Sequence, residues 1–130
     1  MIRTIFSILA GAVVAGLVVA AVEAAGHRFF PPPEGLDPSN KEAFAEAIAA
    51  MPVFALLFVP LAWFLGTLVG AIAASNLARE YRKAAGLAVG ALIFAASALT
   101  LVQIPHPLWL AGLGLLGIPI AAWNGSRISV

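Results

Sequence analysis

The sequence has no cysteine and little charge, since Asp, Glu, Lys and Arg make up only 10% of its 130 residues. Without cysteine, disulfides, thiolate metal sites, iron–sulfur clusters and thiol catalysis are excluded. A soluble domain carries roughly 25% charged residues, so an ordinary soluble enzyme is excluded too. Seven basic and six acidic residues give a net charge of +1. There is therefore no basic face to neutralise phosphates, and no nucleic-acid partner is expected.

Hydrophobic residues make up 62% of the chain and fall into four long runs. About 20 apolar residues cross a bilayer as a helix. We therefore predict an all-α membrane protein, a four-transmembrane-helix bundle in a single integral domain over residues 1–130, with spans at 4–25, 52–75, 84–102 and 108–123. The first run is predicted to be a span and not a signal peptide, because its apolar core exceeds the usual length of about 7–15 residues and Glu23 lies where cleavage would occur.

Between the first two spans the composition becomes polar and rich in proline. Pro31, Pro32 and Pro33 predict a stiff, extended loop, and Gly26 is expected to end the first helix. Asp37 followed by Pro38 is typical of a helix start. A short amphipathic outer helix is therefore predicted over residues 38–51 as an extension of the second span, with Phe44, Ile48 and Met51 on its apolar face.

The distribution of basic residues predicts the orientation. Four spans place both termini on one side, and cytoplasmic loops carry an excess of Lys and Arg. Five of the seven basic residues lie in the termini or the second loop, which predicts an N-in/C-in topology with the proline-rich loop outside. These five are Arg3, Arg79, Arg82, Lys83 and Arg127.

Small residues recur every four positions in three of the spans, a spacing that lets helix backbones approach closely in lipid. For all three stripes we favour packing within the chain over a seam with a second copy or another membrane protein, although spacing alone does not separate these partners. The stripes are Ala12, Gly16, Ala20 and Ala24; Ala62, Gly66, Gly70 and Ala74; and Gly86 with Gly90.

No ionisable residue lies in the interior of any span, which argues against a proton-coupled transporter. Pro60 lies near the middle of the second span and predicts a kink, because proline has no amide donor. With Trp63 and Phe64 beside it, this position is interpreted either as ordinary packing or as an apolar pocket for a lipophilic molecule.

A polar cluster is predicted at the outer edge of the bundle. Glu23 and His27 are four residues apart and share a helix face if the first helix continues through Gly26. The topology puts His106 and Gln103 on the same side. Glu23, His27 and His106 supply a ligand set suited to a divalent metal such as zinc. The alternatives are a Glu23–His27 surface pair or a structural polar cluster that docks the proline-rich loop.

The sequence resembles a family of small, uncharacterised bacterial four-helix inner-membrane proteins. The resemblance lies in Gly26-His27 followed by Phe30-Pro-Pro-Pro33 and in Ile104-Pro-His-Pro-Leu-Trp109, and it extends over nearly the whole chain. It implies a location in the bacterial inner membrane and implies nothing about mechanism.

These patterns favour a non-enzymatic binding or accessory component of the membrane, in contact with the lipid bilayer and with a second copy or a membrane-protein partner. Two alternatives stay open at this point. One is a metal-binding or metal-dependent site on the periplasmic face, and the other is a transporter of a neutral or lipophilic solute.

Overall fold

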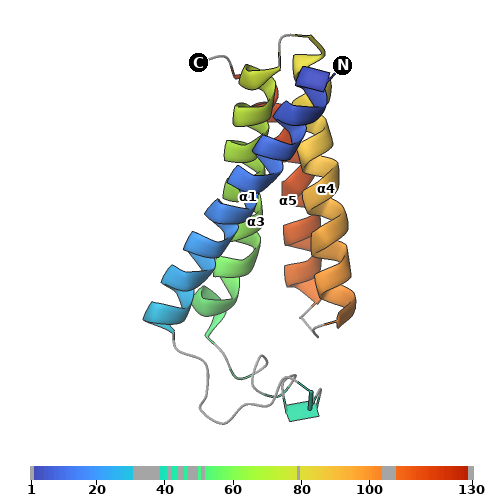
Figure 1. Ribbon diagram of the computed structural model, residues 1–130. Helices are drawn as coiled ribbons and strands as arrows, with labels where there is room; N and C mark the ends of the chain where they lie inside the picture. The colour runs from blue at the N-terminus through green and yellow to red at the C-terminus, as the bar shows by residue number, and fades with distance from the viewer. Residues whose placement is uncertain are drawn as a thin grey trace.

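The computed structural model describes residues 2–30, 39–40, 42–43, 46, 50, 52–78, 80–103 and 108–128. Over these residues the chain forms α1 (Ile2–Phe29), α3 (Val53–Leu77), α4 (Arg82–Gln103) and α5 (Leu108–Gly125), and no strand (Figure 1). All four helices are long and apolar enough to cross a membrane. The predicted all-α four-helix bundle is therefore confirmed.

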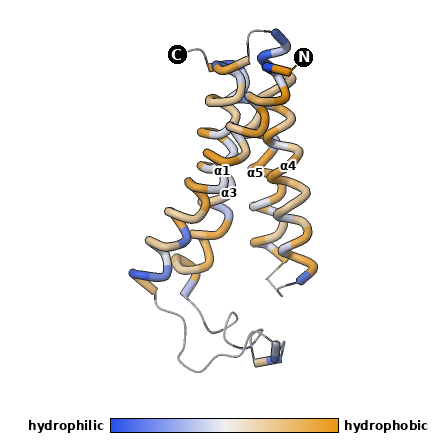
Figure 2. The backbone as a smooth tube through the Cα atoms, viewed as in Figure 1, coloured by the Kyte–Doolittle hydropathy of each residue, from blue (hydrophilic) through white to orange (hydrophobic). Residues whose placement is uncertain are grey.

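The two ends of the bundle differ in what they hold. Both chain termini lie at one end, called the termini end, together with the α3–α4 connection (Figure 1). The other end, called the loop end, holds the last turn of α1, the start of α3, the end of α4 and the start of α5 (Figure 1). Hydrophobic residues run along all four helices between these ends (Figure 2). Toward the loop end, α1 and α3 diverge from α4 and α5 (Figure 1).

The first helix is longer than the sequence predicted. The expectation that Gly26 ends it is wrong, because α1 continues to Phe29 and the Phe30 amide donates to the Gly26 carbonyl oxygen at 2.8 Å. Gly26 is buried, and a methyl group placed on it would lie 2.9 Å from Cγ of Phe58 in α3. Close packing on α3 thus outweighs the weak helix preference of glycine. The ends of the other three helices lie within two residues of the predicted spans.

The predicted outer helix over residues 38–51 lies mostly outside the described residues, as do Asp37, Pro38 and the triple proline. One capping contact falls inside them. The Asn40 side-chain oxygen accepts a hydrogen bond from the Ala43 amide at 3.1 Å, the bond that an N-cap residue makes three positions ahead.

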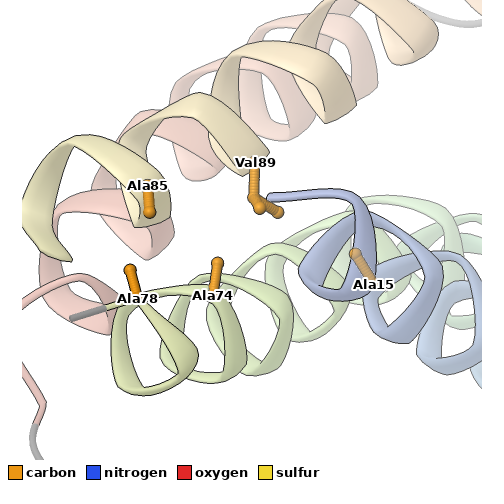
Figure 3. Close-up of a cluster of buried hydrophobic side chains, with 5 residues drawn as sticks. All are labelled: Ala15, Ala74, Ala78, Ala85 and Val89. Carbon is orange, nitrogen blue, oxygen red and sulfur yellow. The ribbon is translucent and has the colours of Figure 1, made fainter. Parts of the chain in front are cut away.

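Helices α3 and α4 each contact the other three helices, and α3 is the centre of the bundle because its interfaces with them are the most extensive; it remains helical through Pro60. Near the termini end, α1, α3 and α4 meet in a core of small side chains (Figure 3). This cluster consists of Ala15, Ala74, Ala78, Ala85 and Val89. With side chains this small, the helix backbones themselves come close together.

Glycines allow the closest of these approaches. A methyl group placed on Gly70 would lie 2.6 Å from the Gly11 carbonyl oxygen, and one on Gly11 would lie 2.7 Å from that of Gly70. On the other side of the bundle, Gly86 of α4 faces Ser126, whose Cβ would lie 2.6 Å from the added methyl. The stripes predicted in α3 and α4 are therefore packing surfaces within the chain, because their members are buried.

The stripe predicted in the first helix behaves differently. Gly16, Ala20 and Ala24 are exposed, and a methyl group on Gly16 would meet none of the described residues within 4 Å. The prediction that this stripe packs within the chain is wrong. Gly11 and Ala15, also four residues apart, form the buried face in its place.

Candidate functional site

The loop end of α1 carries two of the predicted metal ligands. Since α1 continues through Gly26, Glu23 and His27 lie one turn apart on the same helix. Four residues turn a helix by about 400°, so the two side chains leave it on nearly the same side. Glu23 is half-buried and His27 is exposed. The sequence predicted a shared face for Glu23 and His27 only if the first helix continues through Gly26, and it does.

The remaining members of the predicted cluster lie elsewhere. Gln103 ends α4 and is exposed, and the loop end of α4 lies across the bundle from that of α1 (Figure 1). The structure thus does not bring Gln103 to the Glu23–His27 pair. His106 lies outside the described residues. Within the described part of the chain, no group of three His, Asp or Glu side chains is placed to hold a metal. A site that joins Glu23, His27 and His106 stays a prediction.

Pro60, Trp63 and Phe64 lie against α5. Trp63 is only 4% exposed, and its Cζ3 would lie 2.5 Å from a methyl group placed on Gly114. Cδ2 of Phe64 would lie 3.6 Å from a methyl group placed on Gly117, an ordinary van der Waals contact. Gly114 therefore leaves room for the Trp63 ring, and all three residues pack at the α3–α5 interface. These contacts are those of helix packing.

A polar network at the termini end was not predicted. Arg82 donates from Nε to the Ser75 carbonyl oxygen at 2.7 Å and from Nη2 to Asn76 Oδ1 at 2.9 Å. Asn76 Nδ2 donates to the carbonyl oxygens of Ile72, at 2.7 Å, and Ile128, at 3.0 Å. We call Asn76, Arg82 and Ile128 the termini clasp, because they tie α3, α4 and the segment after α5 together.

Arg3 extends this network to the first helix. Its Nε donates to the Leu77 carbonyl oxygen at 2.9 Å. The last carbonyls of a helix have no partner inside the helix and carry a partial negative charge. Arg3 and Arg82 donate to carbonyl oxygens in the last turn of α3 and therefore satisfy polar groups at the end of the central helix. The chemistry at this end is structural capping.

The outer face of α1 is exposed along the whole helix. Residues along it are Ile2, Phe6, Leu9, Val13, Gly16, Ala20, Glu23 and His27, all exposed except the half-buried Glu23. Any helix face recurs at alternating steps of three and four residues, so the spacing alone is not informative. The residue types are informative, because a face that meets only lipid does not need glycine and alanine at its middle or a glutamate and a histidine at its end.

The sequence identified this stripe but placed it inside the bundle, because α1 has two sets of small residues. Gly11 with Ala15 and Gly16 with Ala20 have the same spacing, and only the packing on α3 shows which set is buried. The sequence contains only a weak signal for the termini clasp, namely the polar side chains Asn76 and Arg82 on the two sides of a short connection. The left-handed backbone of Tyr81, with φ at 56°, is part of that connection.

No protein-family model, no curated protein and no solved structure matches this chain.

Proposed function

We propose that the protein is a non-enzymatic component of a cellular membrane that associates with a second copy of itself along the outer face of α1. One observation carries the proposal: Gly16 lies exposed at the middle of a membrane-spanning helix with Ala20 exposed one turn further on, while all four glycines of α3 and α4 are buried in the bundle.

Small residues on a lipid-facing helix favour contact with another helix. Lipid tails are as apolar as leucine, so helices in a membrane associate through close van der Waals packing and not through the hydrophobic effect. A methyl group added to Gly16 meets nothing within 4 Å, so this position is accessible to a second backbone. Val13 and Leu9, about one and two turns from Gly16, are exposed and would flank the contact.

A second copy is the occupant that fits this face. Two copies inserted with the same topology have parallel α1 helices, related by a two-fold axis along the membrane normal. Such an axis sets each residue of the face opposite its own counterpart. Gly16 then meets Gly16 and Ala20 meets Ala20, so the two narrow positions coincide at the middle of the helix.

Single cysteines test this association directly, since the chain has none of its own. Disulfides form only between Cβ atoms about 3.5–4.5 Å apart. We expect Ala20→Cys to form a covalent dimer when native membranes are treated with a mild oxidant. Adding Gly16→Ile to that variant should suppress the dimer, because the larger side chain separates the two helices.

Ala21→Cys is the matched control. Ala21 is exposed at the same depth of the same helix but points about 100° away from Ala20. If Ala21→Cys forms dimers as fast as Ala20→Cys, the crosslinks report random collisions and the proposal fails. Gly112→Ile serves as a second control, because Gly112 of α5 is likewise open, with nothing within 4 Å, and its substitution should leave the Ala20→Cys dimer intact.

A further inference from the structure

We propose that the termini end binds the headgroup of an anionic phospholipid, with Lys83 of α4 and Arg127, just after α5, holding its phosphate and Trp123 supporting Arg127. We call these three residues the basic site. The inference is independent of the proposed self-association, because none of the three residues lies on α1.

The basic site lies at the edge of the membrane-spanning bundle, where α4 begins and α5 ends. Lys83 is in the first turn of α4, and Arg127 follows directly on the end of α5. Trp123 belongs to the last turn of α5 and is 54% exposed. Tryptophan is enriched at the membrane–water interface, at the level of the lipid headgroups. The two cations are therefore at the depth of lipid phosphates.

The packing of α4 on α5 brings the two cations to the same place. A methyl group on Gly86 of α4 would lie 2.6 Å from Cβ of Ser126, and Gly90 also faces α5. Lys83 shares this face of α4, because it precedes the two glycines by three and seven residues. Both Lys83 and Arg127 follow the Gly86–Ser126 contact toward the termini end, on neighbouring segments of chain.

Arg127 is held in place by the ring of Trp123. Its Cζ lies over that ring, 5.5 Å from the centroid, a distance at which a guanidinium is attracted to the face of an indole. The contact orders the side chain without using its N–H donors. A guanidinium with its donors available can hold a phosphate through two parallel hydrogen bonds.

The charges of Lys83 and Arg127 are not used within the bundle. Arg3 and Arg82 donate to the last turn of α3. By contrast, the side chains of Lys83 and Arg127 are exposed, and neither has a hydrogen bond or an ion pair in the part of the chain that the structure describes. Two adjacent cations at headgroup depth attract an anionic lipid more strongly than a zwitterionic one.

An apolar face continues from the basic site into the membrane. Ile120 and Leu116 precede Trp123 by three and seven residues, so all three lie on one side of α5. Ile120 is 56% exposed and Leu116 is 70% exposed. A phospholipid whose phosphate lies at Arg127 can lay an acyl chain along these residues, which a free phosphate ion cannot do. This continuity favours a lipid as the ligand.

The test measures how strongly lipids with brominated acyl chains quench the tryptophan fluorescence of the full chain in vesicles. The chain has three tryptophans. Trp109→Phe removes the one at the loop end, and Trp63 is buried, so Trp123 reports contact with lipid. In phosphatidylcholine vesicles, brominated phosphatidylglycerol should quench this protein more than brominated phosphatidylcholine at the same mole fraction. We expect a local preference of about fivefold or more for the anionic lipid.

Substitution of the cations shows whether this preference comes from the basic site. Lys83→Gln combined with Arg127→Gln should abolish it, and quenching by brominated phosphatidylcholine should stay unchanged because Trp123 remains exposed. Arg28→Gln is the matched control. It removes an exposed cation at the loop end of α1 and should leave the preference intact.

Three results would overturn the inference. The first is equal quenching by the two brominated lipids in the Trp109→Phe protein. The second is a preference that survives the double substitution, which would place the anionic lipid elsewhere on the bundle. The third is loss of the preference when millimolar inorganic phosphate is added at constant ionic strength, which would show that the site takes a free phosphate ion in place of a lipid. None of these results bears on the crosslinking of Ala20→Cys.

Discussion

Thr67 has a hydroxyl group with no hydrogen-bond partner in the middle of the central helix. Its side chain is fully buried, and Oγ1 is the only buried side-chain polar atom among the described residues that lacks a partner. Nearby hydroxyls are satisfied locally, as Ser75 shows by donating from Oγ to the Ile72 carbonyl oxygen at 3.1 Å. Since a buried polar group without a partner costs free energy, Thr67 is a weak point of the core.

We therefore expect Thr67→Val to raise the free energy of unfolding by about 1 kcal/mol, because it replaces the hydroxyl with a methyl group of similar size. Unfolding by sodium dodecyl sulfate, followed by circular dichroism, measures this change. Ser75→Ala is the control and should lower the free energy of unfolding, since it removes a satisfied hydroxyl. A Thr67→Val protein that is less stable than the wild type would mean that Oγ1 does bind a partner, such as a buried water.

The helix interfaces depend on glycine, and the sequence predicted them unevenly. The stripes in α3 and α4 were predicted correctly because each holds the glycines of its helix, whereas Ala91 and Ala95 of α4, which have the same spacing, are exposed. In α1 two sets compete, and the end of the helix was missed because the packing of Gly26 on Phe58 lies outside any local pattern. The termini clasp was missed for the same reason, since Asn76 and Ile128 are 52 residues apart. Local patterns thus predict the helices, but not which faces meet.

Gly70→Ala should lower the free energy of unfolding by about 1–3 kcal/mol, as overpacking in a tight core does. The added methyl would lie 2.6 Å from the Gly11 carbonyl oxygen and 2.7 Å from Cβ of Ala15, and a backbone atom does not move aside easily. The same detergent unfolding assay measures it. Gly112→Ala is matched to it, because that methyl meets nothing within 4 Å and alanine favours the helix. Equal losses in the two variants would show that glycine is not needed for close approach.

At the scale of the whole molecule, the two ends carry opposite charge. The termini end has the exposed cations Arg3, Arg82, Lys83 and Arg127, with Glu80 as the one exposed acid there among the described residues. At the loop end, Glu23, Glu42 and Glu46 outnumber Arg28 within the described part of the chain. Since Lys and Arg are retained on the cytoplasmic side, this asymmetry supports the predicted N-in/C-in orientation.

Labelling of single cysteines tests this orientation. In intact bacterial cells, a membrane-impermeant maleimide should label Gln103→Cys and should not label Ile128→Cys until the membrane is opened. Both residues are exposed at the ends of the bundle, so the difference reports the side of the membrane. Labelling of Ile128→Cys in intact cells would reverse the orientation and place Glu23 and His27 in the cytoplasm.

The two exposed glycines, Gly16 and Gly112, are expected to differ in how often they are substituted among related proteins. Neither has a neighbour among the described residues that would resist a larger side chain, so packing of the described bundle places no demand on either. Substitutions of Gly112 should therefore accumulate freely over evolutionary time, because alanine has a higher helix preference than glycine. If α1 meets a second copy, selection keeps Gly16 small while Gly112 drifts. The ratio of the substitution rates at these two positions in related genomes would then record the association without any purified protein.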